Sequence, residues 1–260
     1  MELGLNGKTA LVTGASRGIG QAIALALAAE GCDLVLTGRD EAALGETRQA
    51  VRAKGRKAVP VALDLRKEGA ERTLIEAAKK EFGRLDILIN NAGATQRGHF
   101  IDMTDAQWQD GFALKFFAHV RLAREAWPLL RASKGALVSI GGTSGRKPES
   151  QFTIGSSVNA AVAAFSKCLA DLGKEEGVRV NCVHPSLVET ERQWKRIRAE
   201  VAASGQTEAQ VRERFVRAMG FTRYGTVEDV ADMVTFIVSG RATWLHGATI
   251  DLDGGELPQL

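Results

Sequence analysis

Seven short apolar runs alternate with longer segments of helical character along this sequence of 260 residues. The runs, such as TALVTG and GALVSI, are rich in Val, Leu and Ile and lack alternating polar residues, which is typical of strands buried on both faces of a parallel sheet. Because strands joined through helices take right-handed crossovers, an α/β fold is predicted: a doubly wound parallel β-sheet of about seven strands, with helices on both faces. The predicted strands cover residues 9–14, 32–38, 57–63, 85–90, 135–140, 178–183 and 247–255.

The segments between these runs are predicted to be helices. Apolar residues at three- and four-residue spacing predict one long helix over 105–131, and FTIGSSVNAAVAAF (152–165) reads as the start of another. No linker divides the chain, so residues 1–260 are predicted to form a single domain. A polar segment at about 186–226 interrupts the pattern after a strand, and this position favours a substrate lid. Further helices are predicted at 18–30, 40–54 and 67–82.

The charge distribution argues against nucleic acid as a partner. The formal net charge is only +3, and basic and acidic residues are interleaved, whereas nucleic-acid binders concentrate basic charge on one face. The one basic segment, RQWKRIR (192–198), is flanked by glutamates and is interpreted as an exposed helix surface. Its side chains would also suit an acidic or aromatic substrate, a weaker interpretation that rests on Trp194, Lys195, Arg196 and Arg198.

The cysteines favour a reducing compartment. Cys32, Cys168 and Cys182 are far apart and show no CxxC spacing, so neither a disulfide framework nor a metal site is predicted, and Cys168 and Cys182 are interpreted as small core residues. No apolar segment approaches the roughly 18 residues that span a bilayer, and the first predicted strand leaves no room for a signal peptide. A cytoplasmic protein without a membrane partner is expected.

A glycine-rich turn connects the first predicted strand to the first predicted helix. In LVTGASRGIGQA, Gly14, Gly18 and Gly20 allow the backbone to approach a pyrophosphate, and the following helix N-terminus offers unpaired N–H groups. A tight turn packed against a helix would need the same glycines. The position between strand and helix favours the nucleotide-binding interpretation and a Rossmann-type sheet.

The spacing GxxxGxG resembles that of the short-chain dehydrogenase/reductase family. Further motifs follow in the family's order: Asp64 in LDL, NNAG at 90–93, HPSLVET at 184–190 with Ser186 in place of a glycine, and DGG at 253–255. The resemblance extends from about residue 5 to 255. It implies a cofactor site made of Gly14, Ser16, Arg17, Gly18, Ile19, Gly20, Arg39, Asp64, Leu65, Asn91, Ala92, Gly93, Pro185, Val188 and Thr190.

The end of the second predicted strand indicates which cofactor binds. An NAD-binding sheet usually carries an acidic residue there for the ribose 2′-hydroxyl, but this chain has Gly38 followed by Arg39. Arg17 lies in the glycine turn, near the same ribose. Two guanidinium groups suit a 2′-phosphate, so NADP(H) is predicted in preference to NAD(H). Either arginine alone could equally be an exposed surface residue.

The catalytic residues implied by the resemblance are missing from their expected positions. The family uses Asn, Ser, Tyr and Lys, of which the tyrosine transfers the proton and the lysine lowers its pKa. Trp108 and Pro128 align the long helix, and the loop SIGGTSG aligns the rest. The four positions then hold Lys115, Gly142, Gly155 and Asn159, and the only tyrosine is Tyr224, far along the chain.

Several residues could supply a rebuilt site. Lys115, within FALKFF, would have a lowered pKa if it is desolvated, although it could instead pair with a carboxylate or extend into water. Asn159 could bind a ribose hydroxyl, and Thr143 and Ser144 could polarise a carbonyl. Ser139, Ser156 and Ser157 leave the assignment of the serine open, and His99 and His184 are interpreted as non-catalytic.

The leading hypothesis is an atypical NADP(H)-dependent oxidoreductase that acts on a small carbonyl or alcohol, with Lys115 or an ordered water transferring the proton. One alternative is a catalytically inactive NADP(H)-binding sensor or structural protein. Another is a non-redox lyase, hydratase or hydrolase that uses the space freed at Gly142 and Gly155. The resemblance also implies a homo-oligomer, a dimer or tetramer, formed through the long helix and the helix that begins near residue 152.

Overall fold

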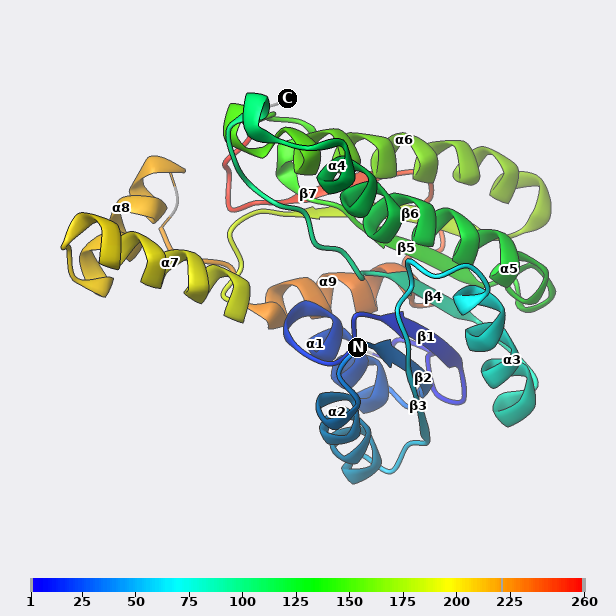
Figure 1. The fold of residues 1–260 in the computed structure, drawn as a ribbon. Coiled ribbons are helices and arrows are strands. Elements are labelled where there is room, and N and C mark those ends of the chain that lie inside the picture. The colour runs from blue at the N-terminus through cyan, green and yellow to red at the C-terminus, as the bar shows by residue number, and fades with distance from the viewer. Residues whose placement is uncertain (1, 221, 259–260) are drawn as a thin grey trace.

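The computed structural model describes residues 2–220 and 222–258; the remaining positions of the predicted domain, and position 221 of the predicted lid, lie outside the described residues. All the strands of the sheet are parallel, in the order β3-β2-β1-β4-β5-β6-β7 (Figure 1). This confirms the predicted seven-stranded Rossmann-type α/β fold. The strands are β1 (Thr9–Thr13), β2 (Asp33–Gly38), β3 (Ala58–Ala62), β4 (Ile87–Asn90), β5 (Ala136–Ile140), β6 (Arg179–Pro185) and β7 (Thr249–Leu252).

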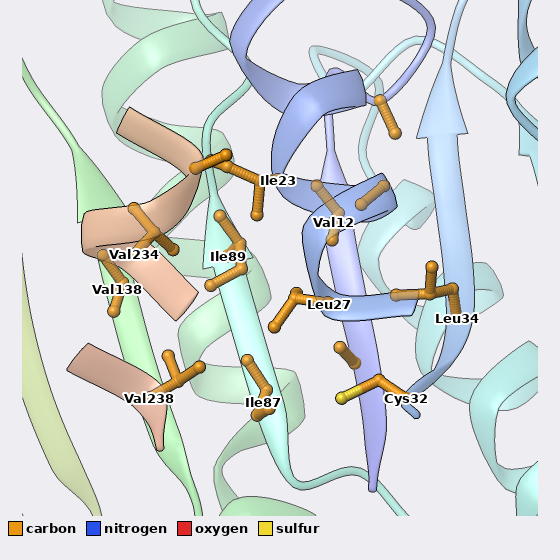
Figure 2. Close-up of a cluster of buried hydrophobic side chains, with 14 of the residues drawn as sticks. Val12, Ile23, Leu27, Cys32, Leu34, Ile87, Ile89, Val138, Val234 and Val238 are labelled. Carbon is orange, nitrogen blue, oxygen red and sulfur yellow. The ribbon is translucent and has the colours of Figure 1, made fainter. Parts of the chain in front are cut away.

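Helices cover both faces of the sheet because successive strand residues point to opposite sides. In β1, Val12 belongs to the same buried cluster as Ile23 of α1 and Val234 of α9, which Figure 2 shows, whereas Leu11 belongs to the core on the other face, with α3 and α5. None of the described helices is both long enough and apolar enough to cross a bilayer. The helices are α1 (Gly18–Ala29), α2 (Glu41–Ala53), α3 (Ala70–Phe82), α4 (Asp105–Phe112), α5 (Ala118–Ser133), α6 (Thr153–Glu176), α7 (Glu191–Ser204), α8 (Glu208–Ala218) and α9 (Val227–Val238).

The predicted long helix over 105–131 is helical throughout, but its centre is not α-helical. The helix α4 ends at Phe112, a π-helical segment covers Ala113–Phe117, and α5 continues to Ser133. The spacing of apolar residues does not reveal the π-helical segment. A wider turn shifts which residues face the core, but it leaves the number of apolar residues the same. Such π-helical turns are frequent at functional sites, and this one contains Lys115.

The segment predicted as a lid folds mainly into α7 and α8, which project from the body of the molecule (Figure 1). The two helices bury a small apolar cluster of their own, around Ile197, Val211 and Tyr224. The chain enters and leaves this segment through one isolated parallel bridge between Val188 and Gly225. The two chain connections between this segment and the sheet therefore run side by side at Val188 and Gly225.

The hydroxyl of Thr13 fixes the loop after β4 to the end of β1. Thr13 is completely buried; its Oγ1 donates to the carbonyl of Ile89 at 3.2 Å and accepts from the N–H groups of Asn91 and Ala92 at 2.8 and 2.9 Å. The Nδ2 of Asn91 also donates to the Thr13 carbonyl at 2.8 Å. In the strand order, β1 and β4 flank the point where the winding reverses, which is where open α/β sheets bind ligands.

We predict that Thr13→Val lowers the free energy of unfolding by roughly 2–4 kcal/mol, because two N–H groups lose their acceptor in a largely buried place. Urea unfolding measures this loss. Thr13→Ser, which keeps the hydroxyl, should lose far less. An unchanged unfolding midpoint for Thr13→Val would show that the hydroxyl contributes nothing.

Candidate active site

A cleft of about 780 Å³ lies at the carboxyl ends of the strands. Its walls include Gly14 after β1, Asn91 after β4, Gly141 after β5 and Ser186 after β6. All the predicted cofactor residues line this cleft, together with Lys115, Gly142, Thr143, Ser144 and Asn159; Gly155 alone among the predicted positions does not. A smaller pocket of about 360 Å³ between α8 and Tyr224 contains none of them.

The glycine turn forms a cradle that excludes side chains. A Cβ at Gly20 would lie 2.2 Å from the carbonyl oxygen of Gly14, and both Gly14 and Gly18 have positive φ, at 66° and 57°. The side chain of Arg17, at the N-cap of α1, makes no capping hydrogen bond. The first amides of α1 are therefore not capped by that side chain, and this backbone fits a pyrophosphate.

The end of β2 offers no carboxylate to a ribose 2′-hydroxyl. A Cβ at Gly38 would lie 3.1 Å from Ser16 Oγ, so the space beside it is already small. Arg17 and Arg39 both line the cleft there and are solvent-exposed. Arg17 Nη2 lies 3.8 Å from Asp40 Oδ2, a loose ion pair at the surface. These residues fit a cofactor that carries a phosphate at this end.

Asp64 lines the cleft from the loop after β3. One oxygen of Asp64, Oδ1, accepts from both the backbone N–H and the Nε of Arg66, each at 3.0 Å. Arg66 also pairs with Asp110 of α4. The loop that carries Asp64 is thereby tied to the helix that leads into the π-helical segment.

Lys115 is a titratable group that lines the cleft from the π-helical segment. Its Nζ donates to the carbonyl of Gly141 at 3.1 Å, and its stem lies against Gly93, where a Cβ would be 2.7 Å from the lysine Cδ. Burial, assisted by the positive charge of Arg192, lowers the pKa of Lys115 to about 7. Both protonation states are therefore populated near neutral pH. No carboxylate pairs with Lys115 among the described residues, which excludes one of the two alternatives raised for it.

Asn159 and Ser144 form a buried hydrogen-bonded pair on the cleft wall. Asn159 Nδ2 donates to Ser144 Oγ at 2.9 Å, whereas its Oδ1 is buried without a partner. A Cβ at Gly142 would lie 2.8 Å from that Nδ2, so the glycine makes room for the amide. Thr143 is buried beside them. The unpaired Oδ1 can accept from a hydroxyl group of a bound molecule.

The space beside Gly155 is filled by an aromatic ring. A Cβ at Gly155 would lie 2.1–2.5 Å from ring atoms of Phe152, which itself lines the cleft. Arg97 lies 4.0 Å above the ring centroid, and Glu149 holds Arg97 through hydrogen bonds of 2.7 and 3.1 Å. The sequence reasoning missed Phe152; its position three residues before Gly155 is the only signal that could have found it.

Most of the other candidates are outside the cleft. Ser139 is buried within β5, the Oγ of Ser156 accepts from the backbone N–H of Glu149, and Ser157 and His99 are exposed. His184 is buried behind Gly141, and burial lowers its pKa to about 4. No metal-binding cluster of His, Cys, Asp or Glu occurs in the described part of the chain.

Two interpretations of the sequence are corrected by the structure. Cys168 is exposed rather than buried, because it lies on the outer side of α6, whereas Cys182 is buried as expected. The basic segment is not simply an exposed helix surface: Arg192, Lys195 and Arg196 line the cleft. Their spacing of three and four residues places them on one side of α7, a pattern that the sequence already contained.

Comparisons with known proteins agree with this geometry. The family model described as short chain dehydrogenase matches residues 8–201. The chain is 32% identical over 254 residues to a versicolorin reductase of Emericella nidulans, with 96% of each covered. It is 28% identical to the 2,3-dihydro-2,3-dihydroxybenzoate dehydrogenase of Bacillus subtilis, with 97% of each covered. The structure of an L-sorbose reductase from Gluconobacter frateurii, complexed with NADPH and L-sorbose, superposes with a TM-score of 0.96 at 32% identity over the full length of both chains.

We predict that Lys115→Met raises the melting temperature, and by more at pH 6 than at pH 9. Below about pH 7 the folded protein must bury the Lys115 ammonium, which lowers the free energy of unfolding by the full amount. Between pH 7 and 10.5 the lysine releases its proton when the protein folds, and this loss of stability becomes smaller as the pH rises. The gain should be about 2–4 °C for each kcal/mol of cost removed. Lys174→Met, at an exposed lysine of α6, is the control. An equal gain at both pH values would contradict a lowered pKa.

Proposed function

The chain belongs to the short-chain dehydrogenase family, and we propose that it is an atypical NADP(H)-dependent oxidoreductase that acts on a small carbonyl or alcohol. The observation that carries this proposal is Lys115, whose pKa of about 7 places a proton donor and acceptor in the cleft that also contains the predicted cofactor residues. A general acid or base acts best when its pKa lies near the working pH.

Several observations support NADP(H) over NAD(H). Arg17 and Arg39 line the cleft beside Gly38, which has no side chain to bind a ribose hydroxyl, and the neighbouring Asp40 forms an ion pair with Arg17. The L-sorbose reductase to which this chain is similar is complexed with NADPH. The glycine cradle would hold the pyrophosphate, and Asp64 and Leu65 would hold the adenine end.

We also propose that the site lacks the family's usual catalytic residues. Lys115, Gly142, Gly155 and Asn159 would occupy the positions of the usual Asn, Ser, Tyr and Lys. Tyr224 cannot replace the tyrosine from its place in the apolar cluster of α7 and α8. The proton must therefore come from another group, and Lys115 is the one with a suitable pKa in the cleft.

Each of the following residues has its own role in the proposed reaction. The nicotinamide, when bound, supplies or accepts the hydride. Lys115 as an ammonium donates a proton to the carbonyl oxygen during reduction, and as a neutral amine it accepts one during alcohol oxidation. Asn159 donates to Ser144 Oγ, which leaves the Ser144 proton free for the same carbonyl oxygen. Thr143 and the unpaired oxygen of Asn159 provide further contacts.

The remaining architecture is proposed on the same basis. Residues 1–260 would form one domain, with α7 and α8 as the lid over the substrate end of the cleft. A homo-oligomer would form through α5 and α6, as the family resemblance implies; Phe117 just before α5 (50%) and Leu172 of α6 (42%) are exposed there. The free cysteines are compatible with a cytoplasmic protein.

We expect reduction to slow as the pH rises through about 7, because the Lys115 ammonium loses its proton, and alcohol oxidation to accelerate over the same range. Lys115→Met should lower kcat by about 10²–10⁴-fold and abolish this pH dependence. A panel of small ketones and alcohols, followed through NADPH absorbance, measures both effects, with Lys174→Met as the control.

Two results would replace the proposal. NADPH binding without turnover of any compound in the panel would favour the inactive sensor or structural protein. Substrate conversion without any change in the cofactor's redox state would favour the lyase, hydratase or hydrolase.

Cofactor preference provides a separate prediction. The double variant R17A/R39A should weaken NADPH binding by about 10–100-fold for each charged hydrogen bond lost, while NADH binding changes little. Fluorescence titration of both cofactors measures the difference, and Arg52→Ala, an exposed position in the last turn of α2, is the control. An equal loss for NADPH and NADH would show that the arginines do not contact a 2′-phosphate.

A further inference from the structure

The end of the cleft beside Lys115 contains more basic side chains than its carboxylates can neutralise. Arg192, Lys195 and Arg196 line it from the first turns of α7, and Lys115 lines it from the π-helical segment. The side chain of Arg192 donates to the carbonyl of Gly93 at 2.6 Å, and Gly93 also contacts the stem of Lys115. Arg192 therefore lies next to the proposed proton-transfer group.

The carboxylates at this end already have cationic partners. Glu149 pairs with Arg97, Glu191 pairs with Arg198, and Glu256 pairs with Lys147 while accepting from Ser186. Neither Arg198 nor Lys147 lines the cleft. The three glutamates are thus occupied, and they do not form ion pairs with Arg192, Lys195 or Arg196.

Arg192 and Arg196 of α7 form no ion pair with a carboxylate within the described residues. The guanidinium of Arg196 lies 4.8 Å from the ring centroid of Phe215 and makes no hydrogen bond or ion pair in the described part of the chain. Burial lowers the pKa of both Arg192 and Arg196, and the positive charge of Arg97 adds to the effect on Arg196. Neither guanidinium has a carboxylate ion-pair partner in the described part of the chain, so the carboxylate or phosphate of a ligand would supply the missing negative charge.

The cofactor's own phosphates have other places to bind. The glycine cradle at the start of α1 fits the pyrophosphate, and Arg17 and Arg39 lie at the opposite end of the cleft lining, beside Gly38. Arg196 interacts electrostatically with Arg97 and Glu149, the two residues that hold the Phe152 ring. Arg192 and Arg196 therefore belong to the substrate end.

We propose that the substrate is an anionic carbonyl or alcohol compound, whose carboxylate or phosphate is bound by Arg192 and Arg196 while its reacting carbon faces Lys115. This inference rests on the proposed function for the position of the reacting carbon. The anion site itself does not depend on turnover. Two planar guanidinium groups on one side of a helix suit a carboxylate or phosphate, because each can donate two parallel N–H bonds.

The test is a calorimetric titration of the NADP⁺-loaded protein with matched pairs of compounds. One pair is 4-oxopentanoate and its methyl ester, and the other is dihydroxyacetone phosphate and dihydroxyacetone. We expect one anion to bind at least 10-fold more tightly than its neutral counterpart, and the pair that shows the effect identifies the anionic group. Arg196→Gln and Arg192→Gln should each weaken that anion by about 10–100-fold without affecting the neutral compound.

Arg198→Gln is the matched control, because Arg198 lies on the same helix, pairs with Glu191 and does not line the cleft. It should leave anion binding unchanged. Equal binding of anionic and neutral compounds in both pairs would overturn the inference, as would an equal loss of NADP⁺ affinity in the arginine variants. NADPH turnover of a neutral ketone without preference for an anion would contradict this inference but keep the proposed function. Selective anion binding without turnover would support this inference but contradict the proposed function.

Discussion

The buried hydroxyl of Thr13 is the contact on which the geometry of the cleft depends. It joins the end of β1 to the loop after β4 at the point where the sheet reverses its winding. That loop continues to Gly93, whose lack of a side chain admits the stem of Lys115 and whose carbonyl accepts from Arg192. One hydroxyl is thus connected, through the loop after β4, to the stem of Lys115 and to the first turn of α7.

The end of the cleft that contains Lys115 lowers the stability of the folded protein. Lys115 lies where water solvates its charge poorly. Its hydrogen bond to the carbonyl of Gly141 compensates only in part for this lost solvation. The π-helical turn between α4 and α5 is a second departure from regular structure at the same residue. Two unfavourable features at one position are typical of a site that function maintains, since a methionine or leucine there would fold more easily.

The sequence predicts the sheet and the glycine turn after β1 well because both are encoded locally. Strand burial follows from uninterrupted runs such as TALVTG, and the cradle follows from the spacing of Gly14, Gly18 and Gly20 within one turn. Phe152 could not be assigned in this way, because its ring is placed by Arg97 and Glu149, which come from distant loops. The wider turn at Lys115 was also hidden, since apolar spacing is preserved through it. The orientation of Arg192 and Arg196 required knowing which side of α7 meets the cleft.

The separate apolar cluster of α7 and α8 has a consequence for how such a protein can diverge. Ile197, Val211 and Tyr224 pack with one another rather than with the main core, and the segment is joined to the rest of the molecule by the bridge between Val188 and Gly225 and by the hydrogen bond from Arg192 to Gly93. Substitutions on this segment therefore leave the packing of the sheet intact. Selection can exchange the charged side chains of α7 while the strands and the glycine turn after β1 are inherited unchanged. The fold thus separates the sheet, whose packing must be kept, from the segment of α7 and α8, whose surface residues are free to change.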